Sequence, residues 1–179
     1  LADAEGDATS IPDTPSIVYT GPAGFAIDSL TFQSSSFSDP QGAGTFAAME
    51  WRIGEITDPG APAYDPNATQ MFEFIALWKS DELTSFNNII DLPGYDLASG
   101  HAYRVRVRMK DTTGKWSHWS APVQFVAGDA DPYILDHLRI TELNYSPHEP
   151  TPDEIAAGHV NASDFEFVEL QNTGAETMD

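Results

Sequence analysis

Cysteine is absent from this sequence of 179 residues, and only 8 lysines and arginines stand against 28 aspartates and glutamates, a formal net charge of −20. Without cysteine, thiol catalysis, zinc–thiolate sites and disulfide frameworks are excluded. The acidity argues against nucleic-acid binding, because such a surface repels phosphate backbones. No run approaches the roughly 18 consecutive apolar residues that a membrane-spanning helix needs. Leu1 is not preceded by Met and no signal peptide is visible, so we expect a fragment of a longer protein.

Helical periodicity is also missing from most of the chain, and short strand patterns replace it. Apolar residues make up 41% and aromatic residues 11% of the sequence, which is typical of a globular protein. Turn clusters rich in Gly, Pro and Asp recur every 8–15 residues. This spacing predicts an all-β antiparallel sandwich. Its expected strands lie at 15–20, 30–37, 46–56, 71–78, within 87–100 (a short strand with a corner), 101–111 and 121–128.

Composition changes divide the chain. Residues 1–14 are acidic and aperiodic, which predicts a tail or linker, and 15–128 would form the sandwich. An acidic, Pro-containing linker at 129–132 leads to a second domain over 133–179. There, strand patterns at 134–145 and 164–174 flank a short helix at 151–158, with Thr151 as cap, Pro152 in the first turn and Gly158 as the end. Two strands cannot make a stable domain, so we expect this one to be incomplete.

A strand of alternating arginines, a turn and a Trp-Ser-x-Trp-Ser motif follow one another within residues 103–120. This segment is similar to the membrane-proximal fibronectin type III domain of cytokine receptors. Leu97, Gly100 and Tyr103 resemble the tyrosine corner of such domains, in which the Tyr hydroxyl bonds to upstream backbone. The resemblance implies an immunoglobulin-like, fibronectin type III-like fold. Cytokine signalling is not expected, because the receptor-type disulfides are absent.

The same segment offers a ladder in which guanidinium groups interleave with indole rings. Arg104, Arg106 and Arg108 lie on one face of the predicted strand, and Trp116 and Trp119 follow the turn. Each cation–π contact is worth about 0.5–1 kcal/mol when exposed, so we expect a packing role. The alternative is that the two tryptophans form a ligand-binding platform.

The second domain resembles the opening of a lamin tail domain. Ile140 to Leu143 fit its first strand, and Glu166 to Gly174 fit its E-F-V-E-L-x-N-T-G segment. The resemblance implies an incomplete immunoglobulin-like β-sandwich with a short-helix insertion, covering about the first third of the family. Bacterial versions occur in large secreted proteins, often of planctomycetes, beside fibronectin-like modules.

No grouping of nucleophile, base and orienting residue is visible, so an enzyme is not expected. Calcium is the one cofactor considered, since it binds clustered oxygen ligands. The candidate ligands for a calcium site are the loop and junction aspartates Asp39, Asp58, Asp65, Asp129 and Asp131. His148, Glu149, Asp153 and His159 could also assemble a metal site, although their spacing fits no known ligand pattern.

These observations predict a non-catalytic structural or interaction module of a secreted or cell-surface multidomain bacterial protein. Its expected partners are neighbouring domains of the parent chain, and pairing of segments 138–145 and 165–172 with a second copy is a further option. The alternative function is a carbohydrate- or surface-polymer-binding module stabilised by calcium, with another surface protein as an alternative ligand. Aromatic residues near loops would then provide the stacking surface: Tyr64, Trp78 and Tyr95.

Overall fold

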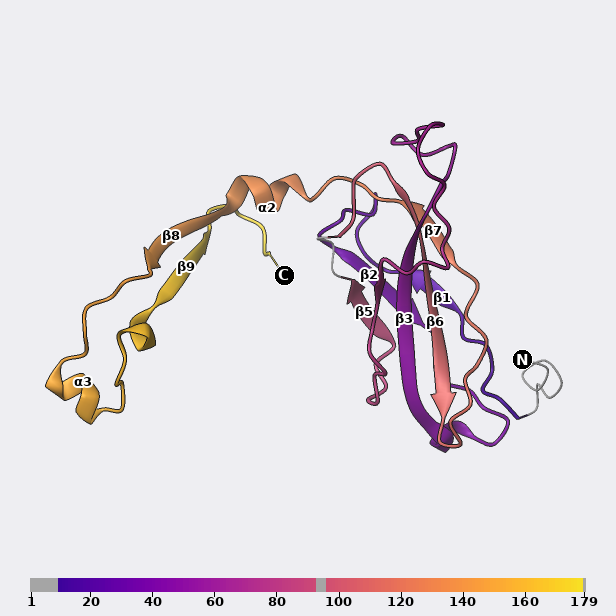
Figure 1. Cartoon of the computed structure of the whole chain (residues 1–179), viewed down its shortest axis with the longest axis horizontal. Helices are drawn as coiled ribbons and strands as arrows, with labels where there is room; N and C mark the ends of the chain where they lie inside the picture. Colours follow the sequence, from indigo (N-terminus) through magenta and orange to yellow (C-terminus); the bar gives the residue numbers. More distant parts are fainter. Residues whose placement is uncertain (1–9, 93–95, 179) are drawn as a thin grey trace. The chain divides into compact units, whose positions relative to one another are not determined.

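The computed structural model describes residues 10–92 and 96–178, and the chain divides into two compact units, Leu1–Ala130 and Asp131–Asp179. The first unit is an antiparallel β-sandwich, as the strand spacing predicts, and the second is a two-stranded ribbon with short helices. Figure 1 shows the strands of both units. None of the helices in the described residues has the length and apolar character to span a membrane.

Two sheets face each other in the first unit. The three-stranded sheet has the order β1-β2-β5, and the four-stranded sheet has the order β4-β3-β6-β7. The first consists of β1 (Ile17–Tyr19), β2 (Leu30–Ser34) and β5 (Ile89–Leu92), and the second of β4 (Trp78–Lys79), β3 (Phe46–Ile56), β6 (Ala102–Asp111) and β7 (Val123–Val126). A short 3-10 helix, η1 (Ala43–Thr45), precedes β3.

Strict alternation along the two longest strands builds the core. Met49, Trp51 and Ile53 of β3 point inward, and their register partners on β6 are apolar as well. Phe32 of β2 and Phe125 of β7 enclose the same cluster from the facing sheet and the neighbouring strand. Because successive side chains of a strand alternate between faces, Glu50 and Arg52 of β3 and the arginines and Lys110 of β6 lie on the outer face of the four-stranded sheet.

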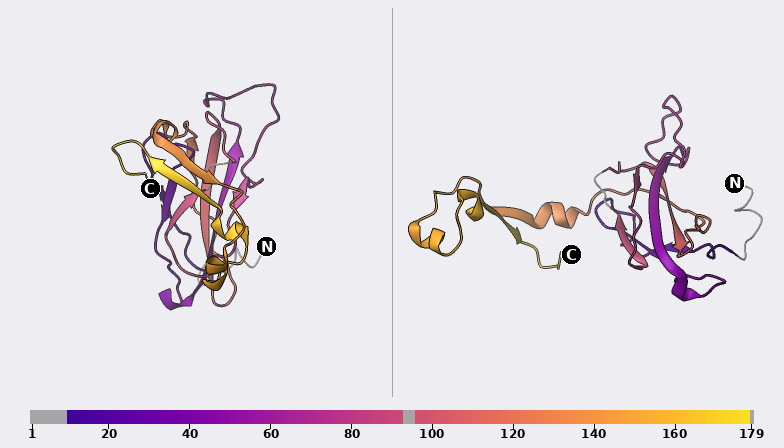
Figure 2. Two further views of the ribbon diagram at one scale, coloured as in Figure 1. Left: turned by 90° about the vertical axis from the view of Figure 1, so that its left-hand side faces the viewer. Right: turned by 60° about the horizontal axis from the view of Figure 1, so that its bottom comes forward.

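The predicted strand at 71–78 is wrong over most of its length. Only Trp78–Lys79 pairs with β3, and the residues before it form a loop that runs from the end of β3 to β4. Figures 1 and 2 show this loop projecting beyond the end of β3. The apolar side chains of Phe72, Phe74, Ile75 and Leu77 are exposed. The segment stays beside β3 without forming a regular strand: the Thr57 amide donates to the Met71 carbonyl at 3.0 Å, and the Leu77 amide donates to the Ile53 carbonyl at 2.9 Å.

In the second unit, α2 (Pro132–His137) precedes β8 (Leu138–Asn144), and α3 (Pro152–Ala156) and a 3-10 helix, η2 (Ala162–Phe165), precede β9 (Phe167–Asn172). The prediction of strand over 134–137 is wrong, because Asp131 caps a helix there through the Tyr133 amide. The predicted short helix is confirmed: Thr151 and Glu154 form a capping box. Gly158 follows α3 with a positive φ of 103°.

The ribbon has one apolar side. Val168 and Leu170 are two residues apart on β9, and their partners on β8 are Leu143 and Ile140. A bulge between Ile140 and Glu142 permits this pairing, because Ile140 and Leu143 are three residues apart. All four side chains are exposed, and none of the described residues of this unit is buried.

Candidate functional site

The outer face of the four-stranded sheet gathers most of the few cations of the chain. Six of the 8 basic residues lie there, with the carboxylates of Glu50, Glu73 and Glu82 among them. The basic residues are Arg52, Lys79, Arg104, Arg106, Arg108 and Lys110. This face is the most chemically distinctive feature of the first unit.

Arg108 lies between two indole rings. Its guanidinium carbon is 4.2 Å from the ring centroid of Trp116 and 4.6 Å from that of Trp119. Lys110 extends the stack over Trp116 at 5.2 Å, and Arg52 extends it over Trp119 at 5.5 Å. The face therefore carries an alternating row of cations and aromatic rings.

The members of this row differ from the predicted ladder. Arg104 and Arg106 were expected in it, yet both pair with Glu73, at 3.3 and 2.7 Å. Arg52 and Lys110 take the two outer places instead. The reason is that Glu73 comes from the loop before β4, so its carboxylate reaches the end of β6 that is remote from the tryptophans.

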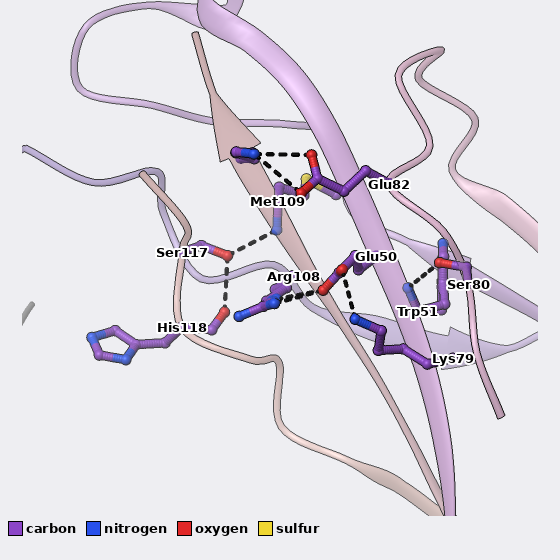
Figure 3. Close-up of polar contacts among 10 residues, drawn as sticks. Glu50, Trp51, Lys79, Ser80, Glu82, Arg108, Met109, Ser117 and His118 are labelled. Carbon is purple, nitrogen blue, oxygen red and sulfur yellow. Dashed lines mark hydrogen bonds and ion pairs between the residues drawn. The ribbon is translucent and has the colours of Figure 1, made fainter. Parts of the chain in front are cut away.

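Glu50 joins the row to the opposite edge of the sheet. Its carboxylate accepts two hydrogen bonds from Arg108, at 2.6 and 2.9 Å, and one from Lys79 at 2.9 Å (Figure 3). The residue is only 4% exposed. Burial raises the pKa of Glu50, but the hydrogen bonds and charges of Lys79 and Arg108 outweigh it and hold the pKa below the ordinary value. Glu50 is thus an ionised, buried centre of the cluster.

Three serines attach irregular segments to the edges of this sheet in the same way. The amide of Ser117 donates to the Met109 carbonyl at 2.8 Å, and its hydroxyl accepts from the Met109 amide at 3.0 Å. Ser120 repeats the arrangement on Val107, at 2.8 and 3.2 Å. Each serine therefore satisfies both main-chain groups of one strand residue, and the two tryptophans are placed over the outer face.

Ser80 makes the same pair of bonds with Trp51 on the other edge, both at 3.0 Å. Figure 3 shows the hydroxyls of Ser80 and Ser117 directed at the main chain of β3 and β6. No local sequence motif identifies Ser80, since only the pairing of β4 with β3 gives this serine its role.

Tyr103 lies at the corner that its motif predicts. Its hydroxyl accepts a hydrogen bond from the Ala98 amide at 2.9 Å, five residues upstream. Gly100 adopts a positive φ of 81° within this turn, a conformation that favours glycine. Burial raises the pKa of Tyr103. The hydroxyl therefore stays neutral and acts as a fixed acceptor.

The aspartates proposed for calcium each accept a hydrogen bond from a different donor. Four of them accept the main-chain amide two residues further on: Asp39, Asp58, Asp65 and Asp131, at 2.7, 2.9, 2.8 and 2.8 Å. Asp129 instead accepts the hydroxyl of Ser99 at 2.5 Å. Within residues 10–92 and 96–178, no three His, Asp or Glu side chains come together to hold a metal ion. The four-residue set around His148 is likewise not assembled there.

The proposed stacking residues do not form a platform. Trp78 is partly buried and packs against the core, whereas Tyr64 is exposed in the loop between β3 and β4. Tyr95 lies outside the described residues. The exposed aromatic side chains near Tyr64 are Phe72 and Phe74, which belong to the apolar strand pattern at 71–78.

Residues 68–131 match the family model of the Rha78A-like N-terminal immunoglobulin domain. The matched segment runs from the loop before β4 through β7 and includes the tryptophan motif. No curated protein matches the sequence. A solved structure titled "Myokine structure" is similar with a TM-score of 0.41 and 15% identity, covering 65% of this chain and 98% of that one.

The family match and the antiparallel sheets agree on the fold class. The first unit is an immunoglobulin-like all-β sandwich. The match covers little more than a third of the chain and stops at the first residue of the second unit.

Proposed function

We propose that the first unit is a non-catalytic structural module that holds neighbouring domains of a secreted multidomain protein in position. The observation that carries this proposal is the outer-face cluster. Its cations, carboxylates and indole rings bind one another, so the most polar surface of the sandwich contributes to its rigidity. Nucleophiles and bases are not grouped on this face, where every carboxylate is engaged by Lys or Arg.

The second unit fits the same role as the beginning of a further domain. The Ile140–Leu143 and Glu166–Gly174 segments that resemble a lamin tail domain contain most of β8 and β9, and the two strands pair. One exposed apolar side is what an opening ribbon presents when further strands are to cover it. An extracellular or cell-surface location is part of this proposal, supported by the same resemblance.

The structural role is tested by replacing Trp119. Trp119→Ala removes the contacts with Arg108 and Arg52, and at about 0.5–1 kcal/mol for each we expect the melting temperature to fall by several degrees. His118→Ala is the matched control, because its exposed side chain belongs to the same segment. A melting temperature that Trp119→Ala leaves unchanged would contradict the structural role.

A further inference from the structure

The loop between β3 and β4 exposes aromatic residues that the sandwich does not use. Phe72 is 52% exposed and Phe74 is 72% exposed, and Ile75 and Leu77 follow them on the surface. The Phe72 and Phe74 rings stack with centroids 5.8 Å apart and planes 13° apart. Single exposed apolar side chains are common, but a contiguous group of large ones on the surface is typical of an interaction site.

The loop is anchored, so these rings have a defined position. Glu73, between the two phenylalanines, is held on the sheet by Arg104 and Arg106. Its backbone lies so close to β3 that a Cβ on Gly54 would come within 2.7 Å of the Glu73 carbonyl oxygen. The Glu73 side chain thus fixes the loop to the outer face of the sheet, while Phe72 and Phe74 on either side of it remain exposed.

A groove of about 550 Å³ lies beside the rings, a size within the usual range for small-molecule sites. Its lining combines apolar surface with free polar groups. Among the described residues, the Gln70 amide and the Tyr64 hydroxyl make no hydrogen bond, and the Nη2 nitrogen of Arg104 is not used by Glu73 or Gln124. Arg104 and Glu73 are the two charged residues of its lining, so the lining is formally neutral, although Glu73 also pairs with Arg106 outside the groove.

We propose that this groove binds a neutral polysaccharide chain. Aromatic rings offer apolar faces to the C–H surfaces of sugar rings, and the free amide, hydroxyl and guanidinium groups can bond sugar hydroxyls. The net charge of −20 disfavours an anionic polymer, and the groove lining carries no net formal charge that one could neutralise. This activity goes beyond the structural role and does not depend on it.

The experiment is affinity electrophoresis of the whole chain in gels that contain a neutral polymer (mixed-linkage β-glucan, galactomannan or dextran) or acidic polygalacturonate. We expect one of the neutral polymers to retard the protein. The double variant F72A/F74A should weaken this retardation about tenfold, because stacking on aromatic rings is lost. Val18→Ala, an exposed apolar position on β1, is the matched control and should bind like the parent.

Gln70→Ala adds a second test, since it removes a free polar group and leaves the rings in place. Weaker retardation by this variant, with an unchanged melting temperature, supports direct contact with the sugar. No retardation in any neutral polymer, or equal retardation of F72A/F74A and the parent, overturns the proposal. Binding to polygalacturonate alone overturns it too. So does self-association abolished by F72A/F74A without polymer binding, which would make the patch a protein contact.

Discussion

At the scale of single residues, Glu50 and Arg108 are the most interdependent pair. Glu50 is buried and accepts bonds from two cations, while Arg108 is also enclosed by two indole rings. Removing one member of a fully buried ion pair costs about 3–5 kcal/mol, and removing Glu50 should cost less, because the Arg108 side chain is 26% exposed. The nearby pair of Lys110 with the exposed Glu82 carries no such penalty.

The lowered pKa of Glu50 gives stability a dependence on pH. A carboxyl whose folded pKa lies below its ordinary value of 4.5 contributes stability above that value and loses it as the pH falls through the folded pKa. We expect Glu50→Gln to be less stable than the parent at pH 7, with the difference shrinking on acidification below about 4.5. Urea unfolding at a series of pH values measures this difference.

Asp111 must be separated from this effect. Burial raises the pKa of Asp111, but hydrogen bonds from Thr113 and from the Lys115 amide lower it by more, so the net pKa is below the ordinary value. Asp111 therefore also loses its stabilising effect in acid. Because Asp111 is present in both proteins, the difference between them isolates Glu50. Glu82→Gln is the control and should follow the parent at every pH. A Glu50→Gln difference that stays constant from pH 7 to 3 would contradict the assignment.

At the scale of elements, serine hydroxyls replace regular strand pairing at both edges of the four-stranded sheet. Ser120 is fully buried, and its hydroxyl accepts from the Val107 amide. Ser120→Ala leaves that amide without its partner, and we expect a loss of about 1–3 kcal/mol in the free energy of unfolding.

Chemical denaturation measures the loss in the free energy of unfolding, and amide hydrogen exchange shows which main-chain amides lose protection. Val107 should lose protection in Ser120→Ala while Met109, held by Ser117, keeps it. Ser99→Ala is a control at an exposed hydroxyl. Equal protection of Val107 in both variants would mean that the hydroxyl adds nothing to the edge.

Local patterns predicted the elements that are regular. The alternation of Tyr103, Val105, Val107 and Met109 with arginines identified β6 and its two faces correctly. The segment 71–77 could not be predicted, because Glu73 forms ion pairs with Arg104 and Arg106, which lie some thirty residues later in the sequence. The helix α2 was missed although Asp131 and Pro132 gave the same capping signal that identified Thr151 and Pro152.

The candidate site shows the same division. Arg108, Trp116 and Trp119 could be named from their spacing, since the turn between them is short. Arg52 and Ser80 could not, because only the sheet order β4-β3-β6 brings Arg52 beside β6 and Ser80 to the main chain of β3. Ser117 and Ser120 were visible in the motif, but their bonds to β6 required the structure.

At the scale of the whole molecule, the core belongs to the first unit alone. Every residue of the hydrophobic cluster lies between Leu30 and Ala127, and the described residues 131–178 include no buried one. A chain that ends at Ala130 should therefore melt within about 2 °C of the full chain, since a change of 1 kcal/mol shifts domains of this size by several degrees. Calorimetry measures it, and a much lower melting temperature would show that the second unit stabilises the first.

Calcium provides a second test on the whole chain. A ligand at 100 times its dissociation constant stabilises by about 2.7 kcal/mol. We expect millimolar calcium to shift the melting temperature by less than about 1 °C relative to chelator, because four of the five candidate aspartates each accept a nearby main-chain amide and Asp129 accepts the Ser99 hydroxyl. A shift of several degrees that Asp129→Asn abolishes would instead establish a calcium site at the junction.

The bulge in β8 has a consequence for how this ribbon can vary in length. Thr141 is the residue that interrupts the two-residue repeat, so it behaves as a single-residue insertion that the strand absorbs by bending. Its deletion would place Ile140 and Leu143 two positions apart and keep both on the apolar side. Deleting Glu169 from the regular strand β9 would instead move Leu170 to the opposite side. Related sequences should therefore tolerate gaps at position 141 and not at 169.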